Sequence, residues 1–148
     1  MLSTLVTCAS LIAFAANAAP AANTPSQTPA AKTAPKLEMY PIEQNIVDYT
    51  NAERARYGLP ALVVDANLMA TARQHGTWMA VNRQLVHSNI GVAENIAMGQ
   101  QNSQEVLRCW MNSSGHRANI LNGGHRRIGV SAFRTPEGTV FWCQQFMP

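Results

Sequence analysis

The chain has 148 residues, of which 47% are hydrophobic and 13% are charged, and its formal net charge at pH 7 is +3. This size and composition fit one globular domain and leave little room for a second. The mild positive charge, with no block of five or more Lys or Arg residues, is unlike a nucleic-acid-binding arm. We therefore expect no nucleic-acid partner and, because the body of the chain has no run of eighteen apolar residues, no transmembrane helix in the mature chain.

The N-terminal part differs in composition from the rest. Residues 1–18 are uncharged and mostly apolar, and they end in the small-x-small sequence Ala-Asn-Ala that signal peptidase recognises. We predict a cleaved secretory signal peptide over these residues, with an uncleaved N-terminal anchor as the alternative. Residues 19–36 are rich in Ala, Thr, Ser and Gln and carry repeated prolines, which predicts a flexible linker. The globular domain then covers residues 37–148 and lies in the cell envelope or outside the cell.

Three cysteines indicate the redox environment of the domain. Cys8 leaves with the signal peptide, so Cys109 and Cys143 form an even pair in a chain expected in an oxidising compartment. We predict a disulfide between them, closing a loop of about 34 residues and stabilising the fold by roughly 3 to 4 kcal/mol. Neither residue has a close Cys or His neighbour in the sequence, so a zinc site built on these cysteines is not indicated.

The domain is expected to begin with two helices. Pro41 suits a first helical position, and apolar residues recur behind it at helical spacing, which predicts a helix over residues 41–57. A short extended stretch over residues 59–64 follows. Asp65 is then placed to cap a second helix over residues 66–83.

A third helix and a hairpin complete the predicted fold. The helix begins at Ser103 and ends in the breaker-rich residues 112–115. Alternating apolar residues over 128–133, a Pro-Glu-Gly turn and a second extended run over 139–146 predict a C-terminal β-hairpin. Helices before and between strands, together with an antiparallel hairpin, predict an α+β sandwich and argue against a doubly wound parallel sheet.

The residues that carry chemistry fall in two segments, 85–97 and 110–121, which we expect to be loops. The first contains His87 and Glu94, and the second contains His116. Two imidazoles and a carboxylate brought together would form a divalent-metal site with open water positions, or a general acid–base pair. The spacing contains no local ligand pattern such as H-E-x-x-H, so either site depends on the fold.

Several motifs occur in a fixed order along the domain. They are His87-Ser88, Ala-Glu-Asn-Ile-Ala at 93–97, the run at 110–121, Ile-Gly-Val at 128–130 and Phe-Trp-Cys-Gln-Gln-Phe at 141–146. This order resembles bacterial members of the CAP superfamily, which groups cysteine-rich secretory proteins, antigen 5 and plant pathogenesis-related proteins. The resemblance covers essentially the whole domain. It implies a single α-β-α sandwich around a small antiparallel sheet, with a central cleft lined by a His/Glu/Glu/His tetrad.

The tetrad is carried over residue by residue. His87 is similar to the first His of the family, Glu94 to the first Glu, and His116 to the second His. Where the eukaryotic motif carries the second Glu, this chain has Asn112 and Ser113, which lowers the negative charge available to a metal. The resemblance makes His87 and His116 the candidate ligands of Zn²⁺ or another divalent cation. The implied cleft residues are His87, Glu94, Asn95, Ser113 and His116.

Three functions follow from this cleft. The favoured one is a ligand-binding module whose cleft takes a divalent metal, a lipid or sterol, a peptide or a wall component. The second is a metal-assisted hydrolase, with His87 and His116 as ligands and Glu94 polarising a bound water as the candidate catalytic residue. The third is a structural domain in which the remaining tetrad only holds two loops together. We expect a monomer in each case.

The other histidines and the tryptophans have structural interpretations. His75 lies on the inner stripe of the second predicted helix and is expected in the core or at its boundary. His125 lies in a Gly-Gly-His-Arg-Arg connection and is expected to be solvated. The three tryptophans are expected to pack in the core because large aromatic side chains usually contribute burial: Trp78, Trp110 and Trp142.

Overall fold

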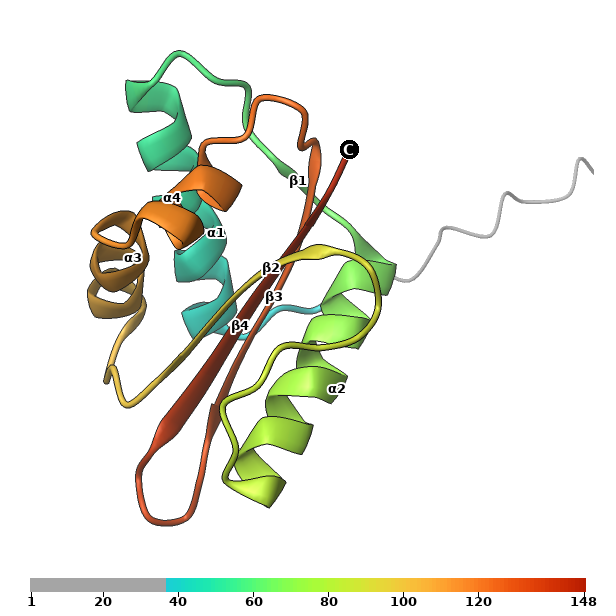
Figure 1. Cartoon of the computed structure of the whole chain (residues 1–148), viewed down its shortest axis with the longest axis vertical. Coiled ribbons are helices and arrows are strands. Elements are labelled where there is room, and N and C mark those ends of the chain that lie inside the picture. The colour runs from blue at the N-terminus through green and yellow to red at the C-terminus, as the bar shows by residue number, and fades with distance from the viewer. Residues whose placement is uncertain (1–36) are drawn as a thin grey trace, which may run out of the picture. The chain divides into compact units, whose positions relative to one another are not determined.

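The computed structural model describes residues 37–148, so the predicted signal peptide and linker lie outside the described residues. Strands run between α2 on one side and the other three helices on the opposite side (Figure 1). Within residues 37–148, no helix has the length and apolar character that crossing a bilayer requires. The elements are α1 (Pro41–Arg56), β1 (Val63–Val64), α2 (Ala66–Asn82), β2 (Ala93–Met98), α3 (Ser103–Met111), α4 (Ser114–Ile120), β3 (Arg127–Arg134) and β4 (Val140–Met147).

The α+β class and the C-terminal hairpin are confirmed. The strand order is β1-β3-β4-β2, with β4 antiparallel to both of its neighbours. The sheet is mixed rather than purely antiparallel, because β1 pairs parallel to β3. This pairing involves only Val63 and Val64, and the apolar pattern of so short a strand carries no information about its direction.

Two segments predicted as loops form regular structure. β2 is buried from Glu94 to Ala97, so it lacks the alternation that marks a half-buried strand. α4 follows α3 almost directly and has only seven residues, too few to display a helical period. Its second residue is Gly115, which also lowers intrinsic helix propensity.

Helix α2 lies unusually close to the sheet. A Cβ added to Gly129 of β3 would lie 2.1 Å from the carbonyl carbon of Leu68, and one added to Gly76 would lie 2.3 Å from Ser131 Oγ. The backbone of α2 therefore approaches β3 at a distance that side chains at these two positions would prevent. The interface is closed by buried side chains of α2, β2 and β4: Ala72, Met79, Ala80, Ile96, Phe141 and Cys143.

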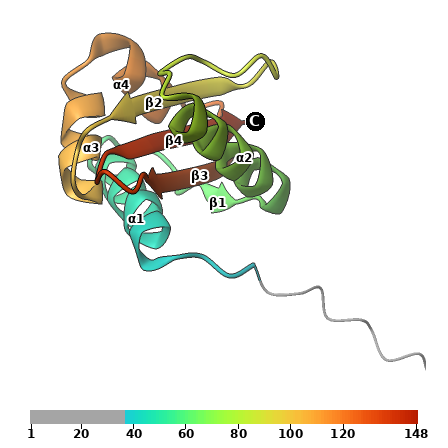
Figure 2. The ribbon, with the colours of Figure 1, turned by 90° about the horizontal axis from the view of Figure 1, so that it is seen from below.

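The chain reverses direction after α2. Arg83 adopts a left-handed conformation, with φ of 53°, and its N–H bonds to Met79 O, which ends the helix. Residues 83–92, the α2–β2 loop, then run back beside α2 before entering β2 (Figure 1, Figure 2). This course brings the loop against one face of α2 and places its residues at the candidate site.

The main core lies on the sheet face opposite α2. Trp110 and Trp142 are fully buried there, as predicted, and Trp110 Nε1 donates to Ile96 O on the outer edge of β2. Two interpretations are corrected. Trp78 is 44% exposed, because it lies on the face of α2 that turns toward the α2–β2 loop. His125 is buried, because its ring stacks on Phe146 at 5.3 Å.

The predicted disulfide is wrong: Cys109 and Cys143 are both free. Cys109 is exposed on α3, whereas the side chain of Cys143 is buried on the α2 face of the sheet. Because the sheet separates them, the two residues cannot reach the Cβ separation of roughly 3.5 to 4.5 Å that a disulfide needs. An even cysteine count carries no information about the face on which each thiol lies.

Candidate functional site

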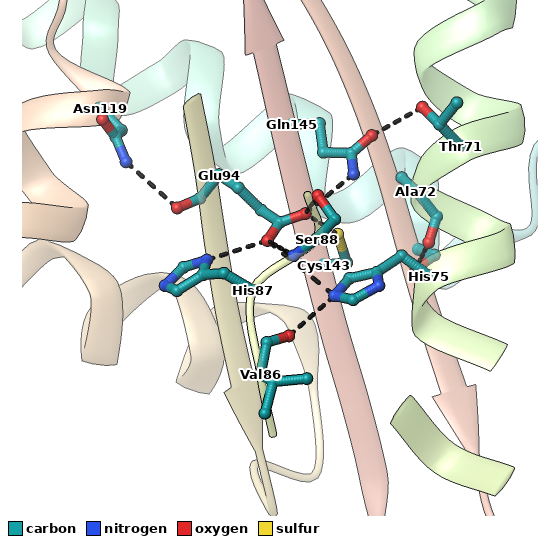
Figure 3. Close-up of polar contacts among 11 residues, drawn as sticks. Thr71, Ala72, His75, Val86, His87, Ser88, Glu94, Asn119, Cys143 and Gln145 are labelled. Carbon is teal, nitrogen blue, oxygen red and sulfur yellow. Dashed lines mark hydrogen bonds and ion pairs between the residues drawn. The ribbon is translucent and has the colours of Figure 1, made fainter. Parts of the chain in front are cut away.

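Glu94 is the centre of a polar cluster between β2, β4 and the α2–β2 loop. Its side chain is 3% exposed. One carboxylate oxygen accepts hydrogen bonds from His87 Nδ1 and Ser88 N, both at 2.9 Å. The other accepts from Ser88 Oγ at 2.6 Å and from Gln145 Nε2 at 2.9 Å, as Figure 3 shows. A single carboxylate therefore ties the loop to two strands.

These hydrogen bonds keep Glu94 ionised. Burial alone would raise the pKa of its carboxyl group, but the hydrogen bonds from Ser88, Gln145 and His87 outweigh burial and lower the pKa from 4.5 to about 2. An ionised Glu94 accepts a hydrogen bond from His87 Nδ1–H. In the neutral tautomer that makes this bond, Nε2 of the same ring can accept a hydrogen bond from outside. The side chain of His87 is 60% exposed, so this nitrogen is accessible.

We expect the stability of the domain to fall in acid because of Glu94. Its folded-state pKa of about 2 lies below the ordinary value of 4.5, so the ionised carboxylate stabilises the fold above pH 4.5. This contribution, about 3 kcal/mol, is lost as the pH falls from 4.5 through about 2. Urea denaturation from pH 7 to pH 2 measures it. Glu94→Gln should be less stable at pH 7 and should lose less stability over this acid range. Parallel pH profiles for the two proteins would contradict the assignment.

His75 of α2 joins the cluster from the other side. Its Nε2 lies 2.8 Å from Val86 O and 4.0 Å from Glu94 Oε1. Its ring stacks in parallel on that of Trp78, with 6.1 Å between the centroids. The prediction placed His75 in the core or at its boundary, which is confirmed, but its contact with the loop was missed. Nothing in the local sequence indicates which loop a helix face will meet.

Cys143 provides a further buried neighbour. Its Sγ lies 3.6 Å from Glu94 Oε2. Burial, followed by the negative charge of Glu94, raises the pKa of this thiol well above 9.0. The thiol is therefore protonated at neutral pH and acts as a weak hydrogen-bond donor, not as a nucleophile.

A chain of side-chain amides holds α4 against β2. Asn119 Nδ2 donates to Glu94 O at 3.2 Å and to Asn95 Oδ1 at 2.9 Å. Asn95 is fully buried, and its Nδ2 donates to His116 O at 3.1 Å and to Gln144 Oε1 at 3.2 Å. Asn95 thus positions the backbone of His116. Because these bonds join β2, β4 and α4, they fix α4 relative to the carboxylate of Glu94.

His116 lies within electrostatic reach of His87. Burial and, to a smaller extent, the repulsion that a protonated His87 would exert lower the pKa of His116, so its ring is neutral at pH 7. Its Nδ1 is buried without a hydrogen-bond partner among the described residues. Ser113 is the N-cap residue of α4 but makes no side-chain capping bond. The structure therefore joins His87 directly to Glu94 and brings His116 to the same neighbourhood.

An open pocket of about 370 Å³ lies between α2 and the α2–β2 loop. His87 is at its edge, whereas Glu94 and His116 do not line it. Glu94 lies behind the lining residues and holds Ser88 and His87 in place. The lining residues are Thr71, Gln74, His75 and Trp78 of α2 and Val86, His87, Ser88, Asn89 and Ile90 of the loop.

The comparisons with known proteins identify the family. The model of the cysteine-rich secretory protein (CAP) family matches residues 47–146, more than half of the chain. The chain belongs to the CAP family. This membership confirms the resemblance seen in the sequence.

Similar proteins show the extent of the CAP domain. Protein YkwD of Bacillus subtilis is 36% identical over 122 residues, covering 71% of this chain and 46% of YkwD. An extracellular SCP-domain protein of Bacillus anthracis is 29% identical, with a TM-score of 0.64, over 71% of this chain and 39% of that one. An outer surface protein of Borrelia burgdorferi is 18% identical, with a TM-score of 0.67, over 74% of this chain and 94% of that one. This likeness concerns the fold alone. The chain spans less than half the length of the curated relatives it matches.

The donor atoms around Glu94 that the structure describes do not make up a complete zinc site. Within residues 37–148, no group of three or more His, Cys, Asp or Glu side chains is arranged to hold a metal. The oxygens of Glu94 are already engaged by four hydrogen bonds, and the Cys143 thiol is protonated. The imidazoles of His87 and His116 are left, whereas zinc sites generally use three or four protein ligands. Metal binding through these two histidines stays a prediction.

Proposed function

We propose that this CAP-domain protein is an extracytoplasmic binding module that takes a small ligand in the pocket between α2 and the α2–β2 loop. The observation that carries the proposal is the pocket itself, with the accessible imidazole of His87 at its edge. Its volume of about 370 Å³ lies within the range of small-molecule sites in proteins. The extracellular relative from Bacillus anthracis supports the proposed location.

The hydrogen bonds of the site favour binding over hydrolysis. A nucleophilic serine needs a neighbouring base to accept its proton. Here Ser88 Oγ donates to Glu94, whose pKa of about 2 makes it a weak base, and the Cys143 thiol is buried and protonated. His87 already donates Nδ1–H to Glu94, so its ring is fixed in orientation and offers Nε2 to a ligand. The metal-assisted hydrolase, in which Glu94 would polarise a water bound to a metal on His87 and His116, stays a prediction.

The pocket is expected to bind at least one of three small probes. We would titrate the purified protein with palmitate, trialanine and N,N′,N″-triacetylchitotriose and follow backbone amide signals by NMR. A ligand of the pocket should shift the signals of residues 74–90 at saturating concentration, because these residues provide most of its lining.

A matched pair of variants locates the binding. Val86→Asp places a charge in the pocket lining and should weaken binding at least tenfold, because an apolar contact is replaced by a desolvated carboxylate. Val63→Asp changes an exposed valine of β1 outside the pocket and should leave binding unchanged. If none of the probes shifts residues 74–90, or if Val86→Asp folds and binds normally, the proposed function is wrong.

A further inference from the structure

The pocket has an exposed aromatic side chain as one wall. Trp78 is 44% exposed, although tryptophan usually contributes to burial, and it lines the pocket. Its ring is held parallel to that of His75, which is itself fixed by a 2.8 Å contact with Val86 O. The aromatic surface is therefore held in place before any ligand arrives.

Amide side chains flank this aromatic surface. Gln74 and Asn89 are exposed and line the pocket, and neither side chain has a hydrogen-bond partner within residues 37–148. A primary amide presents two donors and one carbonyl acceptor, which match neighbouring hydroxyl groups of one molecule. Each amide therefore has donors and acceptors to offer a polyhydroxylated ligand.

The pocket lining carries no Asp, Glu, Lys or Arg side chain. Besides Trp78, it contains two exposed aliphatic side chains, Val86 and Ile90, at 43% and 49% exposure. A charged ligand would find no carboxylate, ammonium or guanidinium group in the lining to pair with. A purely apolar ligand would cover the unpaired amides and remove them from water. The lining fits a neutral ligand with both hydroxyl and small apolar groups.

We infer that the pocket binds a pyranose ring of a neutral, N-acetylated glycan. The C–H bonds on the face of a pyranose carry partial positive charge, and they would lie against the electron-rich face of Trp78. Gln74 and Asn89 would bond to ring hydroxyls, and the acetyl methyl group would contact Val86 and Ile90. The inference rests on the proposed function and specifies the class of ligand.

The fold does not favour binding of an extended peptide by strand addition at this site. Peptides commonly add a strand to an open sheet edge. The outer edge of β2 is engaged instead, because Asn119 Nδ2 donates to Glu94 O and Trp110 Nε1 donates to Ile96 O. The pocket is also separate from the strand edges, since its lining comes from α2 and the α2–β2 loop.

Tryptophan fluorescence tests the inference directly. Trp110 and Trp142 are fully buried, so iodide quenching of the native protein reports mainly on Trp78. Saturating N,N′,N″-triacetylchitotriose should protect the emission from iodide, and cellotriose, which lacks acetyl groups, should bind at least fivefold more weakly. Absence of protection, or equal binding of the two sugars, would overturn the inference.

Variants at Trp78 separate stacking from folding. Trp78→Ala should weaken chitotriose binding at least tenfold by calorimetry, whereas Trp78→Tyr keeps a ring and should remain within about threefold of the wild type. Asn89→Ala, on the exposed loop, should weaken binding severalfold and covers the case in which Trp78→Ala fails to fold. Undiminished binding to a folded Trp78→Ala, or to Asn89→Ala, would overturn the inference. If palmitate or trialanine binds the pocket and chitotriose does not, the glycan inference fails while the proposed binding function stands.

Discussion

Replacing Gly129 by alanine should lower the free energy of unfolding by about 3 kcal/mol or more. The added Cβ would lie 2.1 Å from the carbonyl carbon of Leu68 and 2.3 Å from its oxygen. Both clashing atoms belong to the backbone of α2, and Gly129 of β3 is paired with Gln145 of β4, so neither partner can move as a flexible side chain can. Relieving these clashes requires α2 to move away from the sheet, which would loosen its packing against the side of the sheet that carries Glu94 and Cys143. Equilibrium urea denaturation measures the loss.

Gly115→Ala is the matched control for this substitution. Nothing lies within 4 Å of a Cβ added to Gly115, and the residue lies in the first turn of α4. Alanine should therefore be neutral or stabilise the domain by up to about 1 kcal/mol, because glycine is the poorer helix former. If the free energy of unfolding of Gly129→Ala lies within about 1 kcal/mol of the wild-type value, α2 does not approach β3 as closely as the structure indicates.

The parts of the fold that were predicted correctly are those with local signals. Pro41 at the start of α1, the Asp65 cap of α2 and the alternation in β3 are all present in short stretches of sequence. β2 and α4 lack such signals, since the adjacent polar residues Glu94 and Asn95 break the apolar alternation of β2 and α4 is a single short helix. Their structure depends on contacts with distant residues, such as the bond from Asn119 of α4 to the Glu94 carbonyl of β2.

The candidate site was only partly predicted, because some of its contacts also join residues that are distant in the sequence. His87 and Glu94 were recognised together through their place in a family pattern, and the structure joins them by a 2.9 Å hydrogen bond. Spacing did not indicate that Glu94 would lie behind the pocket as a buried anchor, or that His75 and Trp78 would form the opposite wall. These relationships arise because the left-handed turn at Arg83 directs the loop back along α2.

Replacing Arg54 by alanine should lower the free energy of unfolding by about 4 kcal/mol. Arg54 in α1 is fully buried, and its guanidinium donates to four backbone carbonyl groups, one after α1, one at the end of α4 and two after α4. Alanine would leave these oxygens without their donors and would create a cavity. The four acceptors are the carbonyl oxygens of Pro60 at 2.9 Å, Ile120 at 2.7 Å, Asn122 at 3.0 Å and His125 at 3.3 Å.

The Arg54→Ala substitution should also affect the candidate site, because its acceptor Ile120 is the last residue of α4, the helix that carries His116. Arg54→Ala should therefore disturb the NMR signals of α4 more than those of α2 in the protein that remains folded. Arg56→Ala is the control: Arg56 is exposed and pairs with Glu53 at 2.8 Å, so its removal should change stability by less than about 1 kcal/mol. If Arg54→Ala and Arg56→Ala lower the free energy of unfolding by similar amounts, the carbonyl contacts of Arg54 do not hold α4. A large loss for Arg54→Ala alone would identify this arginine as the residue that joins α1 to the helix of His116.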